Sequence, residues 1–188
     1  MEFLKNFNWV DVLLLTLAVR IVYTAGKTGF IVELLKTLGV LFTLLVVFHF
    51  YSTLAGWCPQ VAFFPGQWLP AVAFVVLWLA GVILCRLIRE GFLLMFTVQS
   101  ISLVDSWGAA ALSVVRFLLI GSMLLFLFFA TGVPYLHRGA QGAFVGKHIF
   151  PVAPDTYSKV TRGFVAALFP AEKVNPAVAE VMAAAVKK

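Results

Sequence analysis

The chain has 188 residues, of which 62% are hydrophobic and 12% are charged, and its mean hydropathy is +1.02. Soluble domains contain about 45–50% apolar and about 25% charged residues, so this composition excludes an ordinary soluble protein and predicts an integral membrane protein. The net charge of +6 comes from Lys and Arg scattered between apolar runs. This pattern argues against nucleic-acid binding and favours topology signals and contacts with lipid head groups.

Four apolar runs are predicted to cross the membrane. They are Trp9–Thr24, Thr37–Leu54, Pro70–Cys85 and a run from near Trp107 to near Gly132. The first run is short and contains Asp11 and Arg20. Its LLLTLAV core offsets much of the cost of a charge in a span, and an arginine near one end can extend its head group to the interface.

The second and third runs lie between Lys36 and Arg86, where the chain has no charged residue. That interval has room for two crossings of about 20 residues each. It is interrupted by AGWCPQVAFFPGQWLP, residues 55–70, whose prolines and glycines end helices and whose tryptophans suit a membrane interface. An uncharged aromatic loop along the membrane surface is therefore predicted here.

The segment before the last run, REGFLLMFTVQSISLVDSWG, is apolar but interrupted by polar residues. A short interfacial or re-entrant helix is predicted for it. By the positive-inside rule, Lys27 and Lys36 in the first turn and Arg86 and Arg89 after the third run place both turns in the cytoplasm and both termini outside.

The tail contains PDTYSKVTRGFVAALF, in which Val160, Phe164 and Leu168 recur at helical spacing behind Asp155 as a plausible N-cap. This predicts an amphipathic helix that lies in the interface or packs on the bundle. The end, PAVAEVMAAAVKK, is expected to be frayed rather than a second helix. The predicted fold is an all-α membrane protein, a four-span transmembrane helical bundle with a C-terminal amphipathic interfacial helix, divided into a membrane domain (1–135) and a tail (136–188).

Two stretches carry a family resemblance. The first is Asp11 followed by GKTGFIVELLKTLG, with Gly29, Phe30, Glu33 and Gly39, and the second is VDSWGAAALSVVRFLLIGSMLLF, with Asp105, Gly108 and Arg116. Together they resemble the CvpA family of bacterial inner-membrane proteins, named for colicin V production. The chain departs from the family pattern at Ala25–Thr28, where the family usually has a second basic residue.

The resemblance implies an inner-membrane protein in colicin V production or export, or in envelope maintenance. We expect it to work with a membrane protein partner or as a homo-oligomer. An alternative is a small homo-oligomeric channel or ion-translocating subunit. No catalytic, cofactor-binding or metal-binding motif is recognisable in the sequence, so no enzymatic site, cofactor or metal is predicted.

The ionisable residues in or near the spans form the candidate site. They are Asp11, Arg20, Glu33, Asp105 and Arg116. Because charges inside a membrane are costly, they either line a polar path or pair with one another, and pairs such as Glu33 with Lys36, and Asp105 as a helix cap, favour a structural role. Gly29, Gly39 and Gly108 are predicted to allow close helix packing or a turn.

Overall fold

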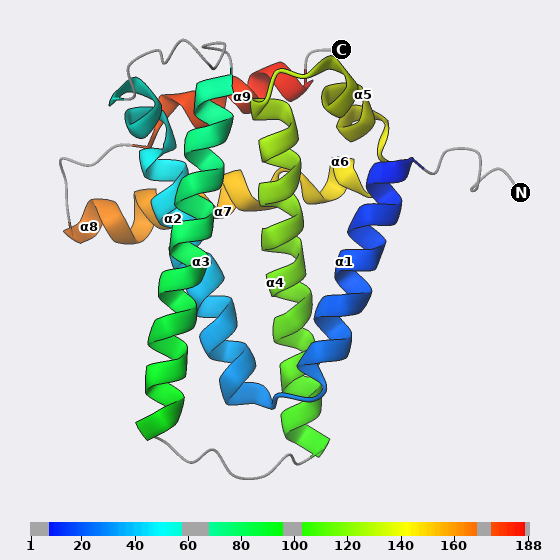
Figure 1. The fold of residues 1–188 in the computed structure, drawn as a ribbon, viewed down its shortest axis with the longest axis vertical. Helices are drawn as coiled ribbons and strands as arrows, with labels where there is room; N and C mark the ends of the chain where they lie inside the picture. Colours follow the sequence, from blue (N-terminus) through cyan, green and yellow to red (C-terminus); the bar gives the residue numbers. More distant parts are fainter. Residues whose placement is uncertain (1–7, 58–67, 96–102, 169–173, 187–188) are drawn as a thin grey trace, which may run out of the picture.

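The computed structural model describes residues 8–57, 68–95, 103–168 and 174–186, and the regular structure of these residues is helical (Figure 1). Four longer helices run side by side: α1 (Trp9–Ala25), α2 (Phe30–Trp57), α3 (Leu69–Met95) and α4 (Leu103–Ala130). The helices α2, α3 and α4 are each long and apolar enough to cross a membrane. At 17 residues, α1 is shorter than the roughly 20 that a span usually needs.

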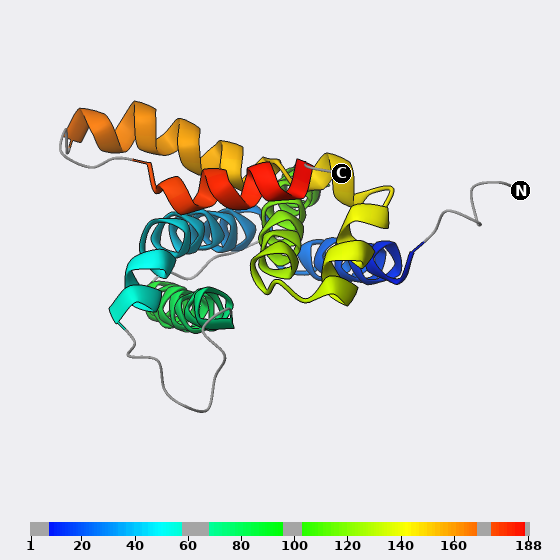
Figure 2. The ribbon, with the colours of Figure 1, turned by 90° about the horizontal axis from the view of Figure 1, so that it is seen from above.

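Helix α2 lies between α3 and α4, and α4 in turn packs on α1 (Figure 2). Helices α3 and α4 pack chiefly on α2 and contact each other only marginally. The α1–α2 turn, the end of α3 and the start of α4 lie together at one end of the bundle, at the bottom of Figure 1. We call this the turn end.

The core is centred on an aromatic cluster that joins three of the long helices to the tail. The ring of Phe48 in α2 lies 4.6 Å from that of Phe126 in α4, 5.6 Å from that of Phe74 in α3 and 5.7 Å from that of Tyr157. All four side chains are almost completely buried. In a membrane, helices associate through close packing of this kind, and these edge-on and stacked ring pairs join α2, α3 and α4 to the tail.

The tail forms short helices that run across the long helices rather than along them (Figures 1 and 2). They are α5 (Pro134–Gly142), α6 (Gly146–Ile149), α7 (Val152–Val160), a π-helical turn (Thr161–Val165), α8 (Ala166–Leu168) and α9 (Pro176–Val186).

Two buried polar side chains hold the tail on the bundle. The Ser122 hydroxyl of α4 donates to the Phe150 carbonyl at 2.6 Å and accepts from the Ala153 amide at 2.8 Å. The side-chain amide of Asn175, just before α9, donates to the Phe48 carbonyl at 2.9 Å and to the Ser52 hydroxyl at 2.9 Å. The tail helices are therefore packed on the protein's own bundle, one of the two arrangements that the amphipathic pattern allows.

Several predicted boundaries are wrong. Helix α2 begins at Phe30 rather than Thr37, so Glu33 and Lys36 lie inside it, where they are paired. Helix α3 continues beyond the apolar run to Met95, and Arg86 and Glu90 form an ion pair at helical spacing in this extension.

The predicted separate interfacial helix is consequently absent from the described residues. Its first part, to Met95, belongs to α3, and its last part, from Leu103, belongs to α4, whereas 96–102 lie outside the described residues, as do 58–67 of the predicted aromatic loop.

The tail departs from the sequence prediction at two points. Helix α7 begins at Val152 with Pro151 as its N-cap, so Asp155 lies in its first turn and is not the cap. The end predicted to be frayed forms α9, in which Val178 is buried against the bundle.

The close contact between α2 and α3 gives a first testable prediction. A Cβ atom at Gly81 would lie 2.6 Å from the Thr43 methyl carbon, a distance that real Cβ contacts do not show. Gly81→Ala is therefore expected to lower the thermal unfolding temperature in detergent, and Thr43→Ala in the same chain should recover part of that loss. Gly91→Ala in α3, where the added methyl meets nothing, is the matched control. An equal effect of both glycine substitutions would contradict the close packing.

Candidate functional site

Glu33 lies in the first turn of α2 and is fully buried. The chain reaches it through a tight turn after α1, in which Gly29 adopts a left-handed φ of +74° that favours glycine. The Gly29 carbonyl accepts the Glu33 amide at 3.2 Å. The turn therefore directs the carboxylate inward, toward α4.

Three side chains meet the Glu33 carboxylate. One oxygen, Oε1, accepts from Lys36 Nζ at 2.6 Å and from the Thr28 hydroxyl at 2.7 Å, and Arg116 Nη1 of α4 lies 2.5 Å from Oε2. The side chain of Arg116 is only 8% exposed, and that of Lys36 is 19% exposed. We call Thr28, Glu33, Lys36 and Arg116 the Glu33 cluster.

Asp105 ties the start of α4 to the start of α2. Its Oδ1 atom accepts the Phe30 amide at 3.0 Å, so it caps α2 rather than its own helix, within which it occupies the first turn. A Cβ atom on Gly108 would lie 2.7 Å from the Phe30 ring, and one on Gly39 would lie 3.1 Å from the Cys85 Cβ. These glycines therefore stand where neighbouring helices approach closely.

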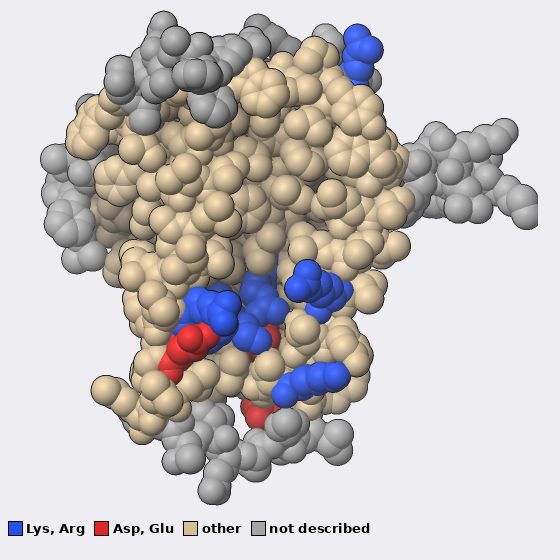
Figure 3. Space-filling view, viewed as in Figure 1, with Lys and Arg blue, Asp and Glu red and all other residues tan. Residues whose placement is uncertain are grey.

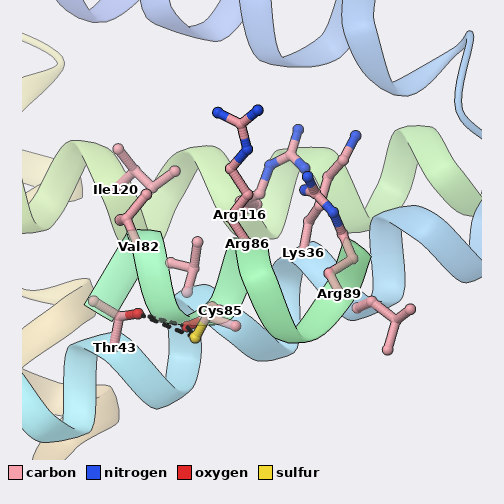
Figure 4. Close-up of a pocket in the computed structure, with 11 residues that line it drawn as sticks. Lys36, Thr43, Val82, Cys85, Arg86, Arg89, Arg116 and Ile120 are labelled. Carbon is pink, nitrogen blue, oxygen red and sulfur yellow. Dashed lines mark hydrogen bonds between the residues drawn. The ribbon is translucent and has the colours of Figure 1, made fainter. Parts of the chain in front are cut away.

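A groove opens beside the Glu33 cluster, between α3 and α4 and floored by α2 (Figure 4). Its volume is about 250 Å³. Four cationic side chains line it: Lys36, Arg86, Arg89 and Arg116. In Figure 3, the Lys and Arg side chains of the face in view gather mostly in its lower half, toward the turn end. We call this feature the cationic groove.

The five ionisable residues predicted as one candidate site do not lie together. Glu33 and Arg116 are in contact, and Asp105 of α4 accepts the amide of Phe30, which lies one turn before Glu33 in α2. Asp11 lies near the opposite end of the bundle, where its carboxylate accepts the amides of Phe144 and Val145.

Arg20 lies apart on α1. Its side chain is exposed, and the shallow depression around it is lined by Leu15, Thr16, Val19 and Tyr23. The next cation toward the turn, Lys27, places its ammonium group 4.4 Å above the Tyr23 ring.

Sequence reasoning missed part of the site. Arg86 and Arg89 were interpreted only as topology signals, and Lys36 as a topology signal and a partner of Glu33. The helical register of each could have placed it on a face shared with the neighbouring span. Thr28 carried no signal, because its bond to Glu33 depends on the fold of the turn.

The arrangement fits ion pairing and anion binding. The carboxylate of Glu33 is neutralised by two cations, and the side chains around the groove are mostly cationic or aliphatic. Among the described residues, no group of three or more His, Cys, Asp or Glu side chains could hold a metal ion.

Comparison with known proteins identifies a family for this chain. A family model described as colicin V production protein matches residues 10–154, which include the turn, the Glu33 cluster and the cationic groove. No curated protein and no solved structure matches the chain. Because the match covers well over half of the sequence and spans all four longer helices, the chain belongs to the colicin V production (CvpA) family of membrane proteins.

Proposed function

We propose that this protein is a non-enzymatic component of the bacterial inner membrane that acts in colicin V production or export, or in envelope maintenance, as part of a membrane complex. The observation that carries the proposal is the Glu33 cluster. Each carboxylate oxygen of Glu33 is met by a cation, so the buried charges close the turn end instead of forming a set of reactive groups. Family membership supports the process.

In this proposal, α1 is a fourth crossing. Its 17 residues extend about 25 Å at 1.5 Å per residue, and the exposed Arg20 can reach a head-group region from within the helix. The turn end carries Lys27, Lys36, Arg86 and Arg89, which supports a cytoplasmic location for it and an outside location for both termini.

Helix α3 supports membership of a complex or contact with lipid, because it leaves a large apolar surface uncovered. Val76, Leu79, Ile83, Leu87 and Ile88 are each more than half exposed. In a membrane, such a surface is covered by acyl chains or by another protein's helix.

Gentle detergent extraction of a tagged chain, followed by native mass determination, tests the proposal. A second protein retained at fixed stoichiometry is expected, and its identity would distinguish colicin export from envelope maintenance. A homogeneous homo-oligomer with no second protein would contradict membership of a hetero-complex.

The second candidate is a homo-oligomeric channel or ion-translocating subunit. The observation that favours it is Arg20, a charged side chain exposed among apolar neighbours on α1, a surface that a second copy could cover. In proteoliposomes, Arg20→Gln should then abolish ion flux at unchanged protein abundance. Flux that is absent from the wild-type protein would exclude this candidate.

A further inference from the structure

The cationic groove holds more positive charge than its acidic neighbours compensate. Lys36 and Arg116 share the carboxylate of Glu33, and Arg86 and Arg89 both lie near Glu90, at 2.8 and 3.9 Å. Four cations therefore face two carboxylates. Arg89 of α3 and Arg116 of α4 line the groove from the two helices that flank it. Positive charges held together around a cavity favour binding of an anion in that cavity.

The chemistry of the groove changes along its length. On each of the three helices, the cation lies toward the turn end and an aliphatic side chain lies one to two turns farther into the bundle (Figure 4). On α2 the aliphatic residue is Val40, on α3 it is Val82 and on α4 it is Ile120. A free phosphate would use only the cationic end, whereas an amphipathic anion matches both ends.

The groove is reached from the side of the bundle. Helices α3 and α4 pack on α2 and scarcely touch each other, so no tight contact between α3 and α4 closes the groove on its side. Arg86 is 69% exposed and Arg89 is 25% exposed, so both are available at the rim. At about 250 Å³, the groove is smaller than the roughly 300–1,000 Å³ of sites that enclose a drug-sized ligand. It can hold a head group and the start of a chain, but not a whole lipid.

We propose that the cationic groove is a binding site for one anionic phospholipid. Arg86 and Arg89 bind the phosphate at the rim, with the cations of the Glu33 cluster beneath it, and the first part of an acyl chain lies against Val82 and Ile120. Guanidinium groups suit this role because their planar N–H donors match phosphate oxygens in pairs. The inference requires only that the turn end meets a lipid leaflet, and it does not depend on a protein partner.

The test measures retained lipid by native mass spectrometry of the full chain in mixed micelles containing either phosphatidylglycerol or phosphatidylcholine. One phosphatidylglycerol per chain is expected to be retained in preference to phosphatidylcholine. The double variant Arg86→Gln/Arg89→Gln should weaken this binding about thirtyfold, since each basic residue near a lipid surface contributes about 1 kcal/mol and about 1.4 kcal/mol corresponds to a tenfold change. Size-exclusion chromatography and circular dichroism establish that each variant is folded.

Two further variants separate a built site from general attraction between charges. Arg138→Gln/Lys147→Gln removes the same charge from exposed tail residues outside the groove, and should leave phosphatidylglycerol retention unchanged. Val82→Trp fills the aliphatic part of the groove and should reduce retention of the lipid without removing a charge.

Competition identifies the source of the phosphate. Inorganic phosphate and glycerophosphoglycerol, which lack acyl chains, are expected to displace the lipid only weakly. Equal retention by the Arg86→Gln/Arg89→Gln variant, equal loss in the tail control, or full displacement by inorganic phosphate at the concentration of the lipid would each overturn the lipid site.

Discussion

Replacing Glu33 by glutamine is expected to lower the free energy of unfolding by about 3–5 kcal/mol, the range seen when one partner of a buried ion pair is removed. The substitution keeps the size of the side chain but leaves Arg116 buried without a compensating charge. It also weakens the bonds from Lys36 and Thr28 that fix the α1–α2 turn. Unfolding by a denaturing detergent, followed through tryptophan fluorescence, measures the effect.

Glu90→Gln is the matched control, because it removes the same charge from an ion pair at the surface of α3. Its effect should be small, since solvent screens exposed pairs. A double variant tests whether the unpaired charge of Arg116 causes this loss of stability. Replacing both members of the buried pair, Glu33→Leu with Arg116→Met, should recover much of the stability, because no unpaired charge remains. If Glu33→Gln unfolds like Glu90→Gln, the Glu33 cluster does not stabilise the turn end.

Asp11→Ala is expected to release the start of the tail from the bundle. The Asp11 carboxylate is 1% exposed and accepts the amides of Asn8, Phe144 and Val145 at 3.0–3.2 Å. Removing it leaves those donors without their acceptor at a cost of about 2–3 kcal/mol. Hydrogen exchange at the Phe144 and Val145 amides should become faster, and protease should cut sooner between α5 and α6.

Asp155→Ala removes an exposed carboxylate from the same tail and serves as the control. It should leave exchange at Phe144 and Val145 unchanged. Unchanged protection of those two amides in Asp11→Ala would show that the tail is held at this point by other contacts.

The helices of the bundle were largely predictable, whereas their ends were not. Long apolar windows identify α2, α3 and α4, because the cost of leaving backbone groups unpaired in lipid forces such runs into helices. Charged residues were interpreted as the limits of these runs. Glu33 instead lies inside α2, where Arg116 of α4 compensates its charge. Because Arg116 is 83 positions away in the sequence, sequence spacing alone does not show that contact.

Distance in the sequence also separates the contacts of the site that could be predicted from those that could not. The pair of Glu33 with Lys36 follows from i,i+3 spacing and is present. The bond from the Phe30 amide to Asp105 and the binding of tail amides by Asp11 join distant segments, so they required the topology. The helix α9 was missed because a short terminal segment was expected to fray, whereas the side-chain amide of Asn175, just before it, bonds to carbonyl and hydroxyl groups of α2.

The buried bonds of Ser122 and Asn175 have a consequence for biogenesis. The partners of Ser122 follow it by 28 and 31 residues. The groups of α2 that bond to Asn175 wait for a residue 123 and 127 positions later in the chain. Chains fold from the N-terminal part first during synthesis. The membrane helices must therefore be inserted before the tail can dock. The bonds of Asn175 to α2 form only after synthesis has reached the start of α9. A chain stalled before Asn175 would lack the bonds to the Phe48 carbonyl and the Ser52 hydroxyl that tie the start of α9 to α2.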